Sequence, residues 1–183
     1  MTQVQKLQLN NQVDKILHTP GNAPAAGQQL EMAFVFDLFC DEEYLKVTAQ
    51  EVVATLKRHS TIFQNVRSNV VYWGDELSTE AMPMSFIQMG KPFENPQFIA
   101  AKSQQDEKNV EKRANFDDLC AYLKLFHARS KCIIVITREE YVIENKKKVF
   151  ESLNPFLKSR LLVLTPDKMV TGATINIEMM RQK

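Results

Sequence analysis

Acidic side chains follow the first strongly apolar run of the sequence, and their spacing could serve metal or phosphate chemistry. Residues 31–45 read EMAFVFDLFCDEEYL, so Asp37 closes the apolar run and Asp41 follows it closely. A hard cation such as Mg²⁺ binds oxygen, and a strand that delivers a carboxylate to the start of a helix can supply that ligand. The same pattern also suits a plain helix start, because acids there complement the helix dipole.

Further polar residues stand where other apolar runs end. Asp75 follows NVVYW, and Thr137, Arg138 and Glu139 follow CIIVI. The carboxyl ends of parallel strands meet at one edge of a sheet, where ligands bind. The sequence therefore predicts a binding rim made of Asp37, Asp41, Asp75, Thr137, Arg138 and Glu139. If a metal ion bound there, Asp37 and Asp41 would hold it.

Apolar runs alternate with amphipathic stretches along the body of the chain. The runs MAFVFD, NVVYW, CIIVI and RLLVL have strand length, and helical spacing separates them at 42–59, 115–127 and 145–157. The order predicts an α/β fold with an open, mostly parallel, doubly wound, Rossmann-like sheet. The stretch MSFIQMGKPF at 84–93 follows its predecessor closely enough for one antiparallel edge strand. The polar residues 94–114 favour a solvated loop.

Residues 1–30 differ from the rest in composition. A weakly apolar helical stretch is followed by HTPGNAPAAGQQ, in which proline and glycine break regular structure. We interpret 1–30 as an N-terminal arm with a flexible connector, and 31–183 as a single α/β domain. The sequence leaves open whether the arm docks on the domain or contacts another chain. The tail GATINIEMM is a candidate for a further edge strand.

Composition narrows the class of partner. The net charge is +1, so the electrostatic footprint of a nucleic-acid binder is missing, and the run NKKKVF at 145–150 suits a solvated helix face. No apolar stretch has the length of a membrane span, which argues against a membrane partner. The 3 cysteines show no metal-site or disulfide spacing, which favours a reducing cytoplasm. The sequence predicts no cofactor.

The element order carries a resemblance to a known family. FVFD before a long amphipathic helix, NVVYWGDE before a strand that suits antiparallel pairing, and then CIIVIT resemble the von Willebrand factor A domain over about residues 31–167. Family members with an intact adhesion site hold Mg²⁺ with Asp-x-Ser-x-Ser, a threonine and a later aspartate. Here Asp37 matches the first position, but Phe39 and Asp41 replace the serines and Arg138 stands where the later aspartate is expected.

The resemblance therefore implies a degenerate metal-ion-dependent adhesion site. We hypothesise that Arg138 replaces the metal electrostatically and pairs with Asp37 or Asp41. Backbone amides are the other candidate partners for Asp37, because a carboxylate that closes a buried strand requires one.

Two functions follow from these residues. The first is a metal-independent adaptor or scaffold domain that binds another protein, with Tyr72 and Trp73 as candidate interface anchors. The alternative is a Mg²⁺-dependent phosphoryl-transfer or hydrolytic enzyme that uses the strand-end acids. Phe39 stands where phosphatases of the haloacid dehalogenase type place a second aspartate, and the sequence has neither a glycine-rich phosphate loop nor a recognisable nucleophile–base pair. The oligomeric state stays open.

Overall fold

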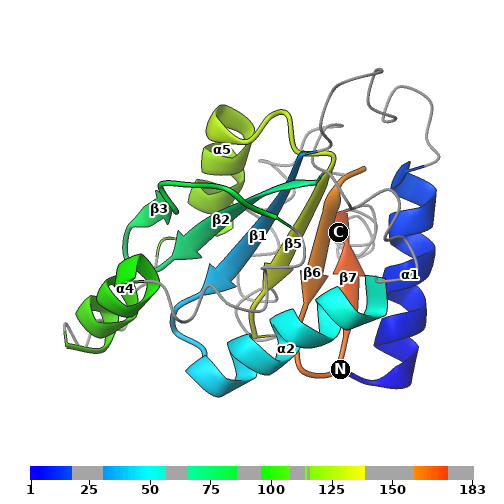
Figure 1. Cartoon of the computed structure of the whole chain (residues 1–183), viewed down its shortest axis with the longest axis horizontal. Helices are drawn as coiled ribbons and strands as arrows, with labels where there is room; N and C mark the ends of the chain where they lie inside the picture. Colours follow the sequence, from blue (N-terminus) through cyan, green and yellow to red (C-terminus); the bar gives the residue numbers. More distant parts are fainter. Residues whose placement is uncertain are drawn as a thin grey trace, which may run out of the picture.

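The computed structural model describes residues 1–17, 31–56, 66–85, 96–107, 114, 116–138 and 159–172. Seven strands within these residues form one mixed sheet in the order β3-β2-β1-β5-β6-β7, and β4 also pairs with β2 (Figure 1). The strands are β1 (Glu31–Asp37), β2 (Arg67–Trp73), β3 (Leu77–Thr79), β4 (Met84–Ser85), β5 (Cys132–Ile136), β6 (Leu161–Leu164) and β7 (Met169–Thr171).

The centre of the sheet is parallel. β1 pairs with β2 on one side and with β5 on the other, and β6 continues the parallel array beside β5. β3 and β4 run antiparallel to β2, and β7 runs antiparallel to β6. The chain thus adds strands in one direction from β1 and then returns to add them in the other, which is consistent with a Rossmann-like, doubly wound sheet.

The prediction of an α/β, mostly parallel sheet is confirmed, but the prediction of one antiparallel edge strand is too simple. Antiparallel strands lie at both edges of the described sheet. At one edge β4 begins the stretch predicted at 84–93, and the short strand β3 was not anticipated. At the other edge β7 forms a tight hairpin with β6, in which Thr165 and Lys168 close the turn.

Helices cover both faces of the sheet (Figure 1). Hydrophobic residues of α1 (Gln3–Leu17), α2 (Glu42–Thr55) and α4 (Pro96–Glu107) pack on one face, and those of α5 (Phe116–Phe126) pack on the other. This division follows from the reversal in strand order, because right-handed crossovers in opposite directions place their helices on opposite faces. None of the described helices is long and apolar enough to cross a membrane.

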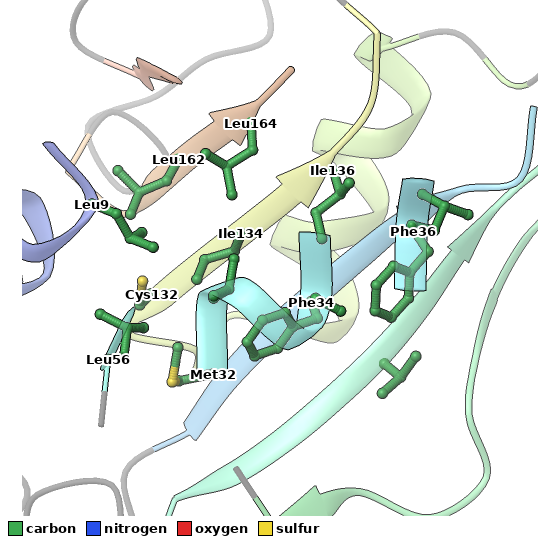
Figure 2. Close-up of a cluster of buried hydrophobic side chains, with 14 of the residues drawn as sticks. Leu9, Met32, Phe34, Phe36, Leu56, Cys132, Ile134, Ile136, Leu162 and Leu164 are labelled. Atoms are coloured by element: carbon green, nitrogen blue, oxygen red, sulfur yellow. The ribbon is translucent and has the colours of Figure 1, made fainter. Parts of the chain in front are cut away.

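Alternation along each strand builds two separate cores. On β1, Phe34 and Phe36 face the α2 side, whereas Ala33 and Val35 face α5. Figure 2 shows the first core, where Leu9 of α1 lies beside Leu162 of β6. Strands buried on both faces carry continuous apolar runs rather than alternating ones, which explains the sequence FVF before Asp37.

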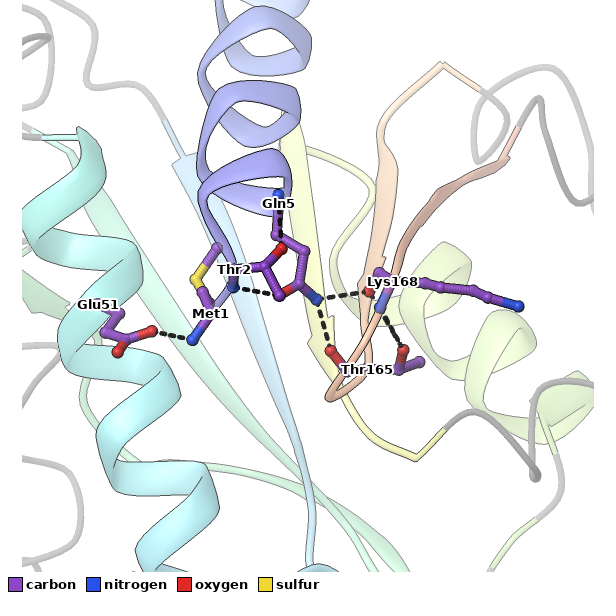
Figure 3. A network of polar contacts seen from close by, with 6 residues as sticks. All are labelled: Met1, Thr2, Gln5, Glu51, Thr165 and Lys168. Carbon is purple, nitrogen blue, oxygen red and sulfur yellow. Dashed lines mark hydrogen bonds and ion pairs between the residues drawn. The ribbon is translucent and has the colours of Figure 1, made fainter.

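α1 packs on the sheet, which resolves the question that the sequence left open for this helix. Leu9, Val13 and Ile16 are buried in the first core. The buried Gln5 side chain donates from Nε2 to the carbonyl oxygens of Thr165, at 2.7 Å, and Lys168, at 3.0 Å (Figure 3). Residues 18–30, which were interpreted as a connector, lie outside the described residues.

The prediction of a loop over 94–114 is wrong for Pro96–Glu107, which form α4. Proline is favoured in the first turn of a helix, where its missing N–H costs no hydrogen bond. Phe98 anchors the helix, since its fully buried ring lies 5.7 Å from the ring of Tyr72. The predicted helix at 145–157 lies outside the described residues, as does the candidate edge strand beyond Gly172.

Candidate binding rim

Asp37 and Thr137 meet at the carboxyl edge of the sheet. In the register of β1 and β5, Phe36 lies beside Ile136, so the residues that follow them, Asp37 and Thr137, are also neighbours. Both side chains are 0% exposed. The Thr137 hydroxyl donates to Asp37 Oδ2 at 2.6 Å, and the backbone N–H of Phe39 donates to Asp37 Oδ1 at 3.0 Å. Each oxygen of this buried carboxylate therefore has a donor from the protein itself.

The turn after β1 is fixed by main-chain bonds. The N–H of Leu38 donates to Trp73 O, and the N–H of Cys40 donates to Asp37 O. Lys102 Nζ donates to Leu38 O at 2.7 Å and so ties α4 to this turn. These contacts hold the turn against β2 and α4 and leave Asp37 facing the end of β5.

The start of α2 lies beside the same edge. Asp41 is the N-cap residue, with extended backbone angles and no capping hydrogen bond from its side chain. Glu42 and Glu43 occupy the first turn. These exposed acids act through their charge on the helix dipole, so the simple helix-start interpretation of Asp41 and Glu42 accounts for their presence. Tyr44 OH donates to Thr137 O at 3.1 Å and links α2 to the end of β5.

Asp75 belongs to a separate turn of the rim. Its Oδ1 accepts the N–H of the neighbouring Glu76 at 3.0 Å, while the N–H of Gly74 donates to Glu76 O. The N–H of Ala114 donates to Gly74 O at 2.8 Å. Asp75 thus shapes the turn between β2 and β3.

Arg138 is exposed at the end of β5. The two ion pairs that the structure shows between described residues join Met1 to Glu51 and Arg67 to Glu31, so neither contains Arg138. The two hydrogen bonds to Asp37 described above come from the Thr137 hydroxyl, which was not among the candidate partners, and from a backbone amide, which was. Glu139, the remaining rim residue, lies outside the described residues.

Charged groups at the rim act on the buried thiol of Cys40. Loss of hydration raises the pKa of Cys40 to about 11, although the positive charges of Arg138 and Lys102 act in the opposite direction. Burial also raises the pKa of Tyr44, with Cys40 as the next contributor. Both groups are therefore neutral at pH 7, and the thiol is a poor nucleophile.

Tyr72 and Trp73 are core residues, which corrects their prediction as interface anchors. Both are 0% exposed. Trp73 packs against Phe116 with ring centroids 5.7 Å apart, and its Nε1 donates to Ala114 O. Tyr72 OH bonds to Glu80. A continuous parallel strand places successive side chains into the two cores, so neither ring is available at the surface.

Sequence reasoning missed Lys102 and Tyr44 as parts of this edge. Lys102 lies in the segment predicted as a loop, and the single signal for its helix was the apolar group of Phe98 and its neighbours. Tyr44 stands in the first turns of a correctly predicted helix, but its contact with Thr137 depends on the packing of α2 across β5.

Comparisons with known proteins found no relative of this chain. No protein-family model, curated protein or solved structure matched the chain significantly. Among the described residues, no group of three or more His, Cys, Asp or Glu side chains is arranged to hold a metal ion.

Proposed function

We propose that this chain is a protein-interaction domain whose rim works without a metal ion. The observation that carries this proposal is the pair of hydrogen bonds to Asp37. The Thr137 hydroxyl and the Phe39 amide each donate to one carboxylate oxygen in a fully buried position. A hard cation would have to compete with both donors for these oxygens, and the side chain of Phe39 offers no oxygen ligand.

We further propose that the domain is von Willebrand A-like with a degenerate adhesion site. The central order of four parallel strands with an antiparallel neighbour beside β2 supports this. The donor set does not fit Mg²⁺, because Arg138 brings a fixed positive charge to the place where the family motif has an aspartate. The internal bond from Thr137 does for Asp37 what a cation does in the family: it stabilises the buried charge.

The rim that remains is suited to contact with another protein. Arg138 is exposed at one side of the edge, and the exposed acids Asp41 and Glu42 lie at the start of α2. An exposed guanidinium can bind a partner's carboxylate through two parallel hydrogen bonds. Charged groups of this kind orient a partner and speed its association more than they add affinity.

Thermal unfolding with and without metal ions tests the metal-independent part of the proposal. Ligands that bind only the folded state raise its stability. We expect the same melting temperature in EDTA and in millimolar Mg²⁺, Mn²⁺ or Ca²⁺ for the wild type. A metal-dependent rise that disappears in Asp37→Ala would reject the proposal and favour the alternative, a Mg²⁺-dependent phosphoryl-transfer or hydrolytic enzyme.

Two charge-reversal variants, one on each side of β5, test the proposed contact between the rim and another protein. Arg138→Glu should abolish co-purification of a rim partner, whereas Arg129→Glu, an exposed arginine at the opposite edge, should leave it intact. Equal recovery of every co-purifying protein with both variants would argue against the rim as the contact surface.

A further inference from the structure

The last turn of α5 exposes two adjacent apolar side chains. Leu125 is 74% exposed and Phe126 is 63% exposed, although α5 otherwise buries its apolar residues against the sheet. Single exposed apolar residues are ordinary on protein surfaces, but an adjacent pair beside a half-buried aromatic ring forms a patch. Tyr122 supplies that ring, with its centroid 4.7 Å from that of Phe126.

Polar contacts beneath this patch hold it in place. The hydroxyl groups of Tyr122 and Thr79 are 2.6 Å apart, and Thr79 Oγ1 lies 3.0 Å from Nε2 of the buried His127. The end of α5 is thereby attached to the edge strand β3. Because these contacts already fix the Tyr122 ring, a partner that packs against this ring does not have to order it on binding.

The charged residues next to the patch are basic. Arg129 is exposed in the turn that follows Phe126. Lys124 is also exposed, but it is two residues from both Tyr122 and Phe126 in the helix and therefore does not share their side of α5. Arg160 reaches the same turn, since its Nη1 lies 3.4 Å from Ala128 O. The acids of α5, Asp117 and Asp118, are in its first turn; the exposed Asp118 lies one helical turn before Tyr122, whereas Leu125 and Phe126 are at the other end of the helix.

Glu31, an acid of β1, already has a partner. Glu31 lies close enough to His127 to act on its pKa, but its carboxylate also pairs with Arg67 at 3.8 Å. Within the described residues, the exposed apolar pair is therefore bordered mainly by positive charge.

We propose that Tyr122, Leu125, Phe126 and Arg129, called here the α5 surface, bind a protein segment with apolar side chains flanked by aspartate or glutamate. The apolar pair supplies the anchors, and the basic border selects an acidic rather than a basic partner. A nucleic acid would use the cations but has no comparable use for an exposed leucine beside a phenylalanine. The α5 surface lies at the amino edge of the sheet, so it does not depend on the function proposed for the rim.

Selection from random peptides tests both the site and the chemistry of its occupant. A phage library of random peptides of about sixteen residues, long enough for an amphipathic helix, would be selected on the whole chain. Phe126→Ala is the diagnostic variant, and Leu7→Ala is its control, because Leu7 is 62% exposed on α1. Arg129→Glu and Arg138→Glu form the matched pair for charge.

We expect enriched peptides to combine apolar residues with an excess of Asp and Glu. Their synthetic versions should bind at least about tenfold more weakly to Phe126→Ala, a change of about 1.4 kcal/mol, and no more weakly to Leu7→Ala. Binding should weaken in high salt and in Arg129→Glu but not in Arg138→Glu.

Three results would overturn the proposal: no peptide that depends on Phe126, enriched peptides without an acidic excess, or self-association of the chain that Phe126→Ala abolishes. The last would make the α5 surface a contact between two copies. Peptides lost only in Arg138→Glu would support the rim and reject the α5 surface, so the two proposals can fail separately.

Discussion

Replacing Thr137 with valine tests whether the protein itself stabilises the buried charge of Asp37. Valine keeps the branched shape of threonine but cannot donate the 2.6 Å hydrogen bond to Asp37 Oδ2. Both side chains are 0% exposed, so water does not readily replace the lost donor. Hydrogen bonds to charged groups contribute about 1.5–3 kcal/mol, and we expect a loss of about 2 kcal/mol. For a chain of this size, that loss lowers the melting temperature by about 4–8 °C.

Urea unfolding measures this loss directly. Trp73 is the single tryptophan of the chain and lies in the second core, so its fluorescence reports the unfolding of the sheet. The control is Thr165→Val, since Thr165 is 3% exposed and its hydroxyl bonds only neutral main-chain groups of Lys168 in the contacts that the structure shows. We expect that variant to lose about 1 kcal/mol.

A double-mutant cycle isolates the interaction between the two residues. Asp37→Ala and Thr137→Val, alone and combined, should give a coupling free energy of about 1.5 kcal/mol or more, because residues in one hydrogen-bonded pair are not additive. A coupling below about 0.5 kcal/mol, or a Thr137→Val loss no greater than that of Thr165→Val, would refute the reasoning.

Further predictions concern α1, the cysteines and His127. Leu9→Ala, at a fully buried position of α1, should cost about 2–5 kcal/mol in urea unfolding, whereas the exposed Leu7→Ala should stay within about 0.5 kcal/mol. All three cysteines are buried and free, and burial raises the pKa of Cys132 to about 12, so a thiol reagent should label them only after unfolding. Burial lowers the pKa of His127 below its ordinary 6.5, despite the opposing charge of Glu31. The unfolded chain then binds the proton more readily, so stability should fall as the pH drops below about 6.5, and His127→Gln should lack this component.

Each of these predictions has a contradicting result. Equal stabilities of the two α1 variants would mean that the helix does not dock as described. Rapid labelling of a thiol in the native chain would contradict the burial of the cysteines. A wild-type pH profile parallel to that of His127→Gln between pH 5 and 7 would contradict a lowered pKa for His127, because a shifted pKa makes stability depend on pH.

The fold was predictable where the apolar pattern is strong. β1, β5, β6 and the second half of β2 coincide with continuous apolar runs, because a strand buried on both faces needs an apolar side chain at almost every position. The pattern failed for α4, whose one large buried apolar side chain among the described residues is Phe98. It also failed for β3, because a three-residue edge strand is defined by its pairing with β2 rather than by its own composition.

The rim was predictable as a location but not as a set of bonds. Strand ends place Asp37 and Thr137 at one edge, and the sequence was sufficient to predict that. It was not sufficient to choose between Arg138 and a backbone amide as the partner of Asp37, because that choice depends on the turn that points the Phe39 N–H at the carboxylate. Likewise, strand position alone did not reveal that both faces at Tyr72 and Trp73 are covered by helices.

The two proposed surfaces lie at opposite ends of β5. The α5 surface, which includes Arg129, precedes β5, and Arg138 follows it. The five residues of β5 span about 16 Å at the usual strand rise. The two surfaces are therefore separate sites on the chain. Rim residues supply charge and orientation, whereas the exposed apolar pair supplies the kind of anchor that carries binding energy. If both surfaces act, they can hold two partners at once, and the effects of Phe126→Ala and Arg138→Glu on the two complexes should be independent.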